Sequence, residues 1–157
     1  MGLMLSLSLV FTASSAQLLE QGLDAFERGD VEQARAALKP LADQGSPIAE
    51  TLIGSSYLSG KARDPATAAG YFLHAADRGY APAQLALARL LAKGEGVARD
   101  EAAAYRWALL AAWRDRSAIG GDARALAAGL IRKLRPEARR DAERAARTWQ
   151  VRAASGN

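Results

Sequence analysis

Three blocks of the sequence repeat one arrangement of alanine, glycine and aspartate, and this repetition restricts the fold more than any other feature. The second block contains Ala49, Gly54, Tyr57, Gly60, Asp64, Ala68, Phe72, Ala75-Ala76 and Gly79. The third block has Ala83, Ala88, Leu91, Gly94, Asp100, Ala104, Ala108 and Ala111-Ala112 at the matching positions. The first block matches more loosely, with Leu18, Gly22, Phe26, Gly29, Asp30, Ala34, Leu38 and Leu41-Ala42. Like units that each bury one face on the next form an elongated stack.

Apolar residues recur at spacings of three and four inside each block, which is the pattern of one helix face. The sequence therefore predicts an all-α fold with helices over residues 17–28, 31–43, 47–59, 65–78, 82–93, 101–114, 122–134 and 136–150. Because Pro40 lacks a backbone donor, the helix over 31–43 is expected to kink or end early.

The residues expected at the helix ends agree with these boundaries. Asp30, Asp64 and Asp100 stand where second helices would begin, and an aspartate there accepts hydrogen bonds from free N–H groups. Prolines suit first turns and glycines suit helix ends. The prolines are Pro47, Pro65, Pro82 and Pro136, and the glycines are Gly29, Gly45, Gly60, Gly79 and Gly94.

Small and large apolar residues alternate in a way that predicts close helix contacts. Alanines at 68, 75, 104 and 111 would let backbones approach, and Tyr57, Tyr71, Phe72, Leu91 and Trp107 would fill the space between helices. Burying each large side chain contributes roughly 1.5–3 kcal/mol. Stacking is expected to end in a cap with a polar outer face, supplied by arginines 135, 139, 140, 144 and 147, with Trp149 as its apolar anchor.

The second and third blocks resemble the Sel-1-like repeat, a relative of the tetratricopeptide repeat. The loop Gly94-Glu95-Gly96-Val97-Ala98-Arg99-Asp100 resembles the turn of that family, and the resemblance extends over residues 17–118. It implies an α-solenoid of antiparallel helix-pair repeats that acts as an adaptor or scaffold for protein complexes. We expect copies at 17–46, 47–80 and 81–118, capping helices over 119–150 and a disordered tail over 151–157.

The first sixteen residues differ from the rest. Residues 2–11 are apolar and uncharged, and Thr12-Ala13-Ser14-Ser15-Ala16 follows. This pattern predicts a signal peptide over 1–16, cleaved after Ala16, and export to the periplasm. The run carries no Lys or Arg at its start, so a cytoplasmic chain stays the alternative.

The residue types that catalysis or metal binding needs are scarce. The chain has no cysteine, which excludes disulfides and thiolate metal sites. The segment from Gly54 to Lys61 differs from a phosphate-binding loop in its spacing, and Ala62 replaces the Ser or Thr that would hold magnesium. His74 is the single histidine and is expected to be partly buried and structural. We therefore expect neither an enzyme nor a cofactor.

The resemblance places a partner in the concave groove, which the first helix of each copy lines in solenoids of this kind. The residues opposite the core positions are Glu20, Asp24 and Glu27 in the first copy, Thr51, Ser55 and Leu58 in the second, and Leu85, Arg89 and Ala92 in the third. The groove would change from acidic to weakly basic along its length. We expect a monomer that binds a peptide or helix of another protein, with the partner's basic end beside Glu20, Asp24 and Glu27.

Two other functions stay open at this point. Residues 81–157 carry 15 basic and 8 acidic side chains, so the C-terminal half could bind an anionic membrane surface or nucleic acid. Nucleic acid is disfavoured because Trp149 is the lone aromatic residue near the basic cap. A cell-envelope hydrolase is the remaining alternative.

Overall fold

The computed structural model describes residues 14–59, 63–113 and 115–155 of the chain. These residues form an all-α fold, as the sequence predicts, and no strand occurs in these ranges. The helices are α1 (Ser15–Glu27), α2 (Val31–Asp43), α3 (Pro47–Ser56), α4 (Pro65–Asp77), α5 (Ala81–Lys93), α6 (Glu101–Ala112), α7 (Ala118–Ile131) and α8 (Pro136–Ser155).

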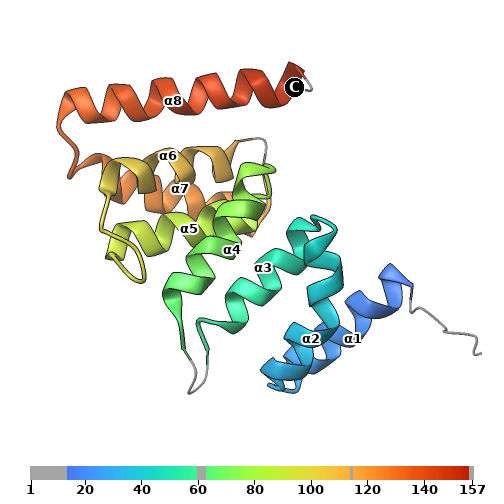
Figure 1. Ribbon diagram of the computed structural model, residues 1–157. Coiled ribbons are helices and arrows are strands. Elements are labelled where there is room, and N and C mark those ends of the chain that lie inside the picture. Colours follow the sequence, from blue (N-terminus) through green and yellow to red (C-terminus); the bar gives the residue numbers. More distant parts are fainter. Residues whose placement is uncertain (1–13, 60–62, 114, 156–157) are drawn as a thin grey trace, which may run out of the picture.

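The helices stack in chain order as antiparallel hairpins (Figure 1). Within the first three hairpins, α1 packs against α2, α3 against α4, and α5 against α6. Each hairpin also packs against the next, through contacts of α2 with α3 and of α4 with α5. The last two helices depart from this arrangement, because α7 packs against α5 and α6, whereas α8 packs against α6 and lies along it (Figure 1). The predicted α-solenoid is therefore present.

The predicted signals at helix ends act as expected where the structure describes them. Asp30, Asp64 and Asp100 are the N-caps of α2, α4 and α6, and each accepts a hydrogen bond from a backbone N–H of the first turn. Pro47, Pro65, Pro82 and Pro136 lie at the first or second helical position. Gly29, Gly45, Gly79 and Gly94 have positive φ, whereas Gly60 lies outside the described residues.

Several helix boundaries differ from the prediction, most of them by one or two residues. Helix α2 has the predicted bounds and runs through Pro40 to Asp43, so the expectation that it ends early is wrong. Helix α7 begins at Ala118 instead of 122, because Ser117 caps it by accepting from the N–H of Ile119 (3.1 Å). Residues 151–155 belong to α8 and are not a disordered tail. Helix α3 ends at Ser56, before the expected 59.

The predicted signal peptide lies mostly outside the described residues, of which Ser14 is the first. Ser14 caps α1 through a reciprocal pair of hydrogen bonds with Gln17. The expected cleavage point after Ala16 therefore lies within the first turn of α1.

The core is built from alanines that bring helices together and from larger side chains between them. Ala68, Ala75, Ala104 and Ala111 are fully buried, as the repeat predicts. Phe72 and Trp107 are buried beside them, whereas Tyr57, Tyr71 and Leu91 are half-buried. Most of this core spans α4 to α8, and a smaller cluster joins α2 and α3 through Leu38, Leu41, Ala42, Ala49 and Ile53.

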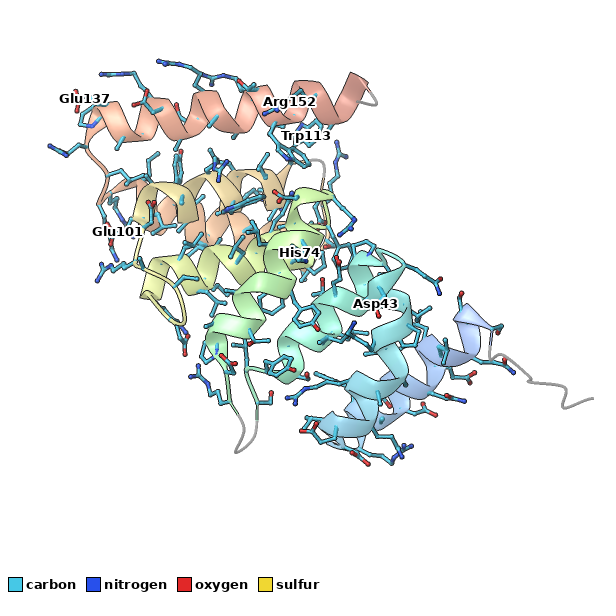
Figure 2. The ribbon with its side chains drawn as sticks, in the orientation of Figure 1. Asp43, His74, Glu101, Trp113, Glu137 and Arg152 are labelled. Carbon is cyan, nitrogen blue, oxygen red and sulfur yellow. The ribbon has the colours of Figure 1, made fainter. Side chains whose placement is uncertain are left out.

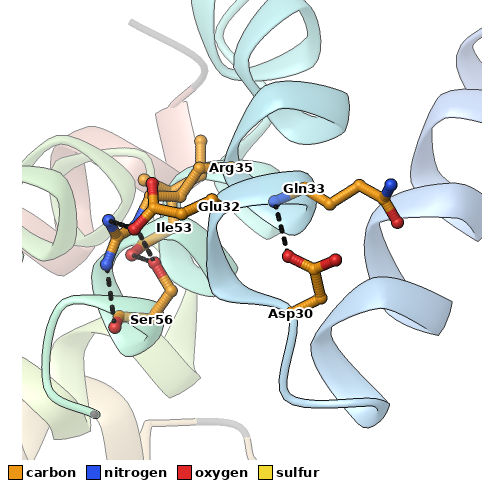
Figure 3. A network of polar contacts seen from close by, with 6 residues as sticks. All are labelled: Asp30, Glu32, Gln33, Arg35, Ile53 and Ser56. Carbon is orange, nitrogen blue, oxygen red and sulfur yellow. Dashed lines mark hydrogen bonds and ion pairs between the residues drawn. The ribbon is translucent and has the colours of Figure 1, made fainter. Parts of the chain in front are cut away.

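Helix α3 has the right-handed residue Tyr57 as its C-cap, and Arg35 of α2 covers that end (Figure 3). Its Nε donates to Ser56 Oγ (2.8 Å) and its Nη2 to the Ser56 carbonyl (3.2 Å). The guanidinium carbon lies 3.8 Å from the centre of the Tyr57 ring, which stacks on Tyr71. A cation at the negative end of a helix dipole is favourable, so Arg35 joins two hairpins and caps one of them.

Helix α8 closes the stack as the expected cap. Its buried side consists of Ala142 and Ala146, with Trp149 half-buried against the main core. Trp149 meets the ring of Trp113 edge to face, with centroids 6.4 Å apart, and Trp113 lies below α8 in Figure 2. The predicted arginines at 135, 139, 140, 144 and 147 are all exposed.

Candidate partner-binding face

The acidic part of the predicted face lies on α1. Glu20, Asp24 and Glu27 are exposed, and the described residues supply no hydrogen-bond or ion-pair partner for these three carboxylates. Leu23 lies on the same side of α1 by its spacing and is 39% exposed. The surface is therefore one apolar side chain with three unpaired carboxylates around it, which we call the acidic surface.

The central part of the predicted face lies on α3 and is neutral. Thr51 and Ser55 are partly exposed, and each hydroxyl donates to the carbonyl four residues earlier on its own helix (2.7 and 2.9 Å). Leu58 is half-buried and packs against the main core. On the same helix, Ile48 is 42% exposed. This region offers apolar contact and hydroxyl acceptors, with no charge.

The prediction for α5 is wrong in one residue. Leu85 is only 1% exposed, because it packs with Ala111 and Ala123 under α7. Arg89 is exposed as predicted, and its Nη2 pairs with Asp122 of α7 (2.7 Å). The accessible side of α5 is therefore carried by Arg89 and Lys93, with Leu85 turned toward the next hairpin.

A hollow between α5 and α7 extends this face beyond the predicted residues. It has a volume of about 410 Å³. Its lining comprises Arg89, Ala92, Lys93, Ala125, Leu126, Gly129, Leu130, Arg132 and Lys133. Except for Arg89 and Ala92, these residues are not among those that the sequence predicts to bind a partner, because α7 lacks the clear repeat pattern. The small or apolar residues Ala125, Gly129 and Leu130 are the signal that could have predicted an accessible side of α7.

The basic surface of the cap is partly neutralised within α8. Arg139 pairs with Glu143 (2.8 Å), Arg140 with Glu137 (3.3 Å) and Arg144 with Asp141 (3.6 Å). Three of the five predicted arginines therefore have a carboxylate beside them. Paired arginines attract an anionic surface less strongly than unpaired ones. No helix in the described ranges is long and apolar enough to span a bilayer.

A second hollow, of about 330 Å³, lies between α2, α3 and α4 and includes the single histidine. His74 is exposed, contrary to the prediction that it is partly buried, and Asp43 lines the same hollow (Figure 2). Glu50 is 4% exposed there and accepts two hydrogen bonds from Arg78 Nη1 (2.8 and 3.0 Å). This pair links the start of α3 to the end of α4.

The described part of the chain holds no group of three or more His, Asp or Glu residues placed to bind a metal ion. Carboxylates with lowered pKa values have structural causes. The pKa of Asp64 is lowered by hydrogen bonds from Thr67 and Ala66, which are its capping contacts. The pKa of Glu101 is lowered by Arg99 and Lys133.

No protein-family model matches the sequence, and no curated protein matches it significantly. The structure is similar to the crystal structure of c5321, a protective antigen present in uropathogenic Escherichia coli strains and displaying an SLR fold. The TM-score is 0.81, with 22% sequence identity over 92% of this chain. This chain spans 31% of the length of that protein. The architecture is therefore the SLR (Sel-1-like repeat) fold.

Proposed function

We propose that this SLR-fold solenoid is a non-catalytic protein-interaction module that binds a peptide or helix of another protein along its first helices. The fold supports a role of this kind, because stacked hairpins present a continuous row of helix faces to a partner. The finer part of the proposal is that the acidic surface of α1 binds the basic end of the partner segment.

The observation that carries this proposal is the placement of Asp24 and Glu27 in the last turn of α1. A carboxylate at the negative end of a helix dipole destabilises the helix by about 0.3–1 kcal/mol. The cation at that end, Arg28, donates to Gln33 instead of to either carboxylate (3.2 Å). These acids therefore do not stabilise the fold, and an exposed Leu23 among them offers an apolar contact to a partner.

Charge reversal tests the proposal. The double variant Asp24→Lys and Glu27→Lys is expected to reduce recovery of the partner in affinity capture, with a smaller difference from the wild type at high salt. Thermal stability should stay the same or rise, because the new cations suit the helix dipole. The matched control is Asp77→Lys and Glu137→Lys, which makes the same charge change on exposed positions of α4 and α8. Equal capture by both variants contradicts the proposal.

We also propose that the chain is exported and acts as a monomer in the periplasm. The apolar residues 2–11 and the small residues after them support export. Cell fractionation and the mass of the periplasmic protein test this proposal. A chain that stays in the cytoplasm at full mass contradicts it.

A further inference from the structure

The hollow between α5 and α7 combines an apolar floor with a cationic rim. The floor consists of Ala92, Ala125, Leu126, Gly129 and Leu130. The rim consists of Arg89, Lys93, Arg132 and Lys133. A volume of about 410 Å³ accommodates a few apolar side chains of a partner but not a whole folded domain.

Two of the four rim cations are uncompensated. Arg89 pairs with Asp122, and Lys133 Nζ lies 3.9 Å from a Glu101 oxygen. Lys93 and Arg132 have no ion pair or hydrogen bond within the described ranges. Both stand at helix C-termini, where a cation is favourable for the helix. The helix dipole explains why these two positions carry cations. It does not explain why apolar residues form the floor between them.

Gly129 leaves the floor of the hollow without a side chain at this position. It lies inside α7, where glycine destabilises a helix relative to alanine. A Cβ atom at this position would meet nothing within 4 Å, so packing does not require glycine there. At Gly54, by contrast, a Cβ would lie 2.8 Å from the Phe72 ring. Glycine at 129 therefore serves no packing contact within the chain, and it leaves room for an approaching side chain.

We propose that this hollow binds an acidic amphipathic helix of a partner protein. An apolar side chain of that helix enters above Gly129, and its carboxylates pair with Lys93 and Arg132. The choice of a polypeptide rests on the proposed function, but the site is separate from the acidic surface of α1. No aromatic ring lines the hollow to stack on a base. Leu130 is buried and Leu126 is half-buried, so neither projects as membrane-inserting side chains do.

Fluorescence anisotropy with the full chain tests the charge and shape of the occupant. The probe is a labelled amphipathic peptide of leucine, alanine and glutamate, and the controls are a shuffled peptide and one with lysine in place of glutamate. The acidic amphipathic peptide is expected to bind about tenfold more tightly than either control, and added salt should weaken it. Equal binding of all three peptides overturns the proposal.

Two variants of one helix locate the site. Gly129→Leu fills the hollow and is expected to weaken peptide binding about tenfold. Gly121→Leu is the matched control, because a Cβ at Gly121 also meets nothing within 4 Å but this residue does not line the hollow. Circular dichroism checks folding, and Gly129→Ala gives a milder change with a smaller loss. Equal effects at 121 and 129 overturn the proposal.

Charge variants separate this site from the others. Lys93→Glu with Arg132→Glu should abolish the preference for the acidic peptide, whereas Arg140→Glu with Arg144→Glu on α8 should leave it unchanged. Asp24→Lys with Glu27→Lys should also leave it unchanged, so failure here and failure of the α1 proposal are distinguishable. Displacement of the peptide by phosphatidylglycerol vesicles or by heparin, more strongly than by unlabelled acidic peptide, would overturn the choice of occupant.

Discussion

The glycines of this chain have different physical reasons to be glycine. Gly54 lies where a Cβ would press on the Phe72 ring, so it permits the close crossing of α3 and α4. Gly96 has φ +70° and lies in the loop before α6, where a Cβ would be 2.2 Å from the carbonyl carbon of Pro65. Gly70 and Gly129 lie inside helices with open space around them. Of these four glycines, Gly54 and Gly96 are required by the fold.

Gly96→Ala is expected to destabilise the protein by at least about 2 kcal/mol, because a left-handed backbone and a backbone overlap act together. The loss should appear as a lower Tm in thermal unfolding followed by circular dichroism. Gly70→Ala is the control, and it should raise stability by about 0.5–1 kcal/mol because a Cβ there is unhindered inside α4. Similar Tm values for the two variants would contradict this account of the loop.

Local signals made the caps predictable at the level of single residues. Asp30, Asp64 and Asp100 accept hydrogen bonds from backbone N–H groups two or three residues later, so their capping role depends only on the neighbouring sequence. Leu85 was predicted wrongly because its exposure depends on α7, which lies more than thirty residues later in the chain. The open floor at Gly129 depends on the same long-range packing. A position opposite one core face can still be buried by the next hairpin.

Helix boundaries, too, were predicted correctly where they depend on neighbouring residues and wrongly where they depend on long-range packing. Tight turns were predicted correctly because a left-handed glycine follows one helix and the next residue is the N-cap of another, as at Gly29, Gly45 and Gly79. The start of α7 was missed because Gly120 and Gly121 indicate a break, although Ser117 caps the helix before them. A Cβ at Gly120 would lie 2.0 Å from the carbonyl oxygen of Asp115, so this glycine permits the close approach of the segment that precedes α7.

One carboxylate adds a polar link between α8 and α6. Glu143 Oε1 accepts from Tyr105 of α6 (3.1 Å) and from Arg139 of α8 (2.8 Å). The hydrogen bond from Arg139 contributes most to lowering the pKa of Glu143, and Tyr105 lowers it further. Burial and the hydrogen bond to Glu143 raise the pKa of Tyr105, so its hydroxyl stays a donor at neutral pH.

This arrangement predicts that acid weakens the docking of α8. A carboxylate whose pKa is lower in the folded state stabilises the fold fully above its unfolded pKa, about 4.3 for glutamate. That stabilisation is lost as the pH falls through the lowered folded value. Tryptophan fluorescence should report the change, because Trp149 of α8 contacts Trp113. Glu143→Gln cannot ionise, so its stability should fall less steeply with acid than that of the wild type.

The test compares how steeply the stability of the wild type and of Glu143→Gln falls with acid. This comparison is needed because Asp64, Glu101 and Asp115 also have lowered pKa values. Those carboxylates add the same acid sensitivity to the wild type and to Glu143→Gln. Parallel curves of stability against pH for the two proteins would show that Glu143 does not control the docking of α8.

At the scale of the whole molecule, the first-helix face carries opposite charges toward its two ends. The acidic surface lies on the first hairpin, and the cationic hollow lies between the third hairpin and the last. Asp24, Ser55 and Arg89 occupy equivalent positions of the three repeats, so the change of charge follows the stack. The two proposals together give the partner segment one direction, with its basic end on α1 and its acidic end beside α7.

Burial is distributed unevenly along the same stack. The main core spans α4 to α8, and α5 is enclosed by α3, α4, α6 and α7. The first hairpin is joined to the rest mainly through α2, by the small cluster around Leu38 and Ile53 and by Arg35. In a solenoid, stability is roughly a sum over repeats and their interfaces, so a terminal repeat with one small interface opens at a lower free energy.

Amide hydrogen exchange should therefore be at least about tenfold faster in α1 and α2 than in α5 and α6, equivalent to roughly 1.4 kcal/mol in opening free energy. Arg35→Ala removes the link to Ser56 and should widen this difference by speeding exchange in α1 and α2 while leaving α5 and α6 unchanged. Gln21→Ala, an exposed change on α1 of the same hairpin, is the control. Since the acidic surface lies on this hairpin, a bound partner should slow its exchange most. Uniform protection across the hairpins would mean that the stack unfolds as one unit and that binding at α1 has no loosely held element to stabilise.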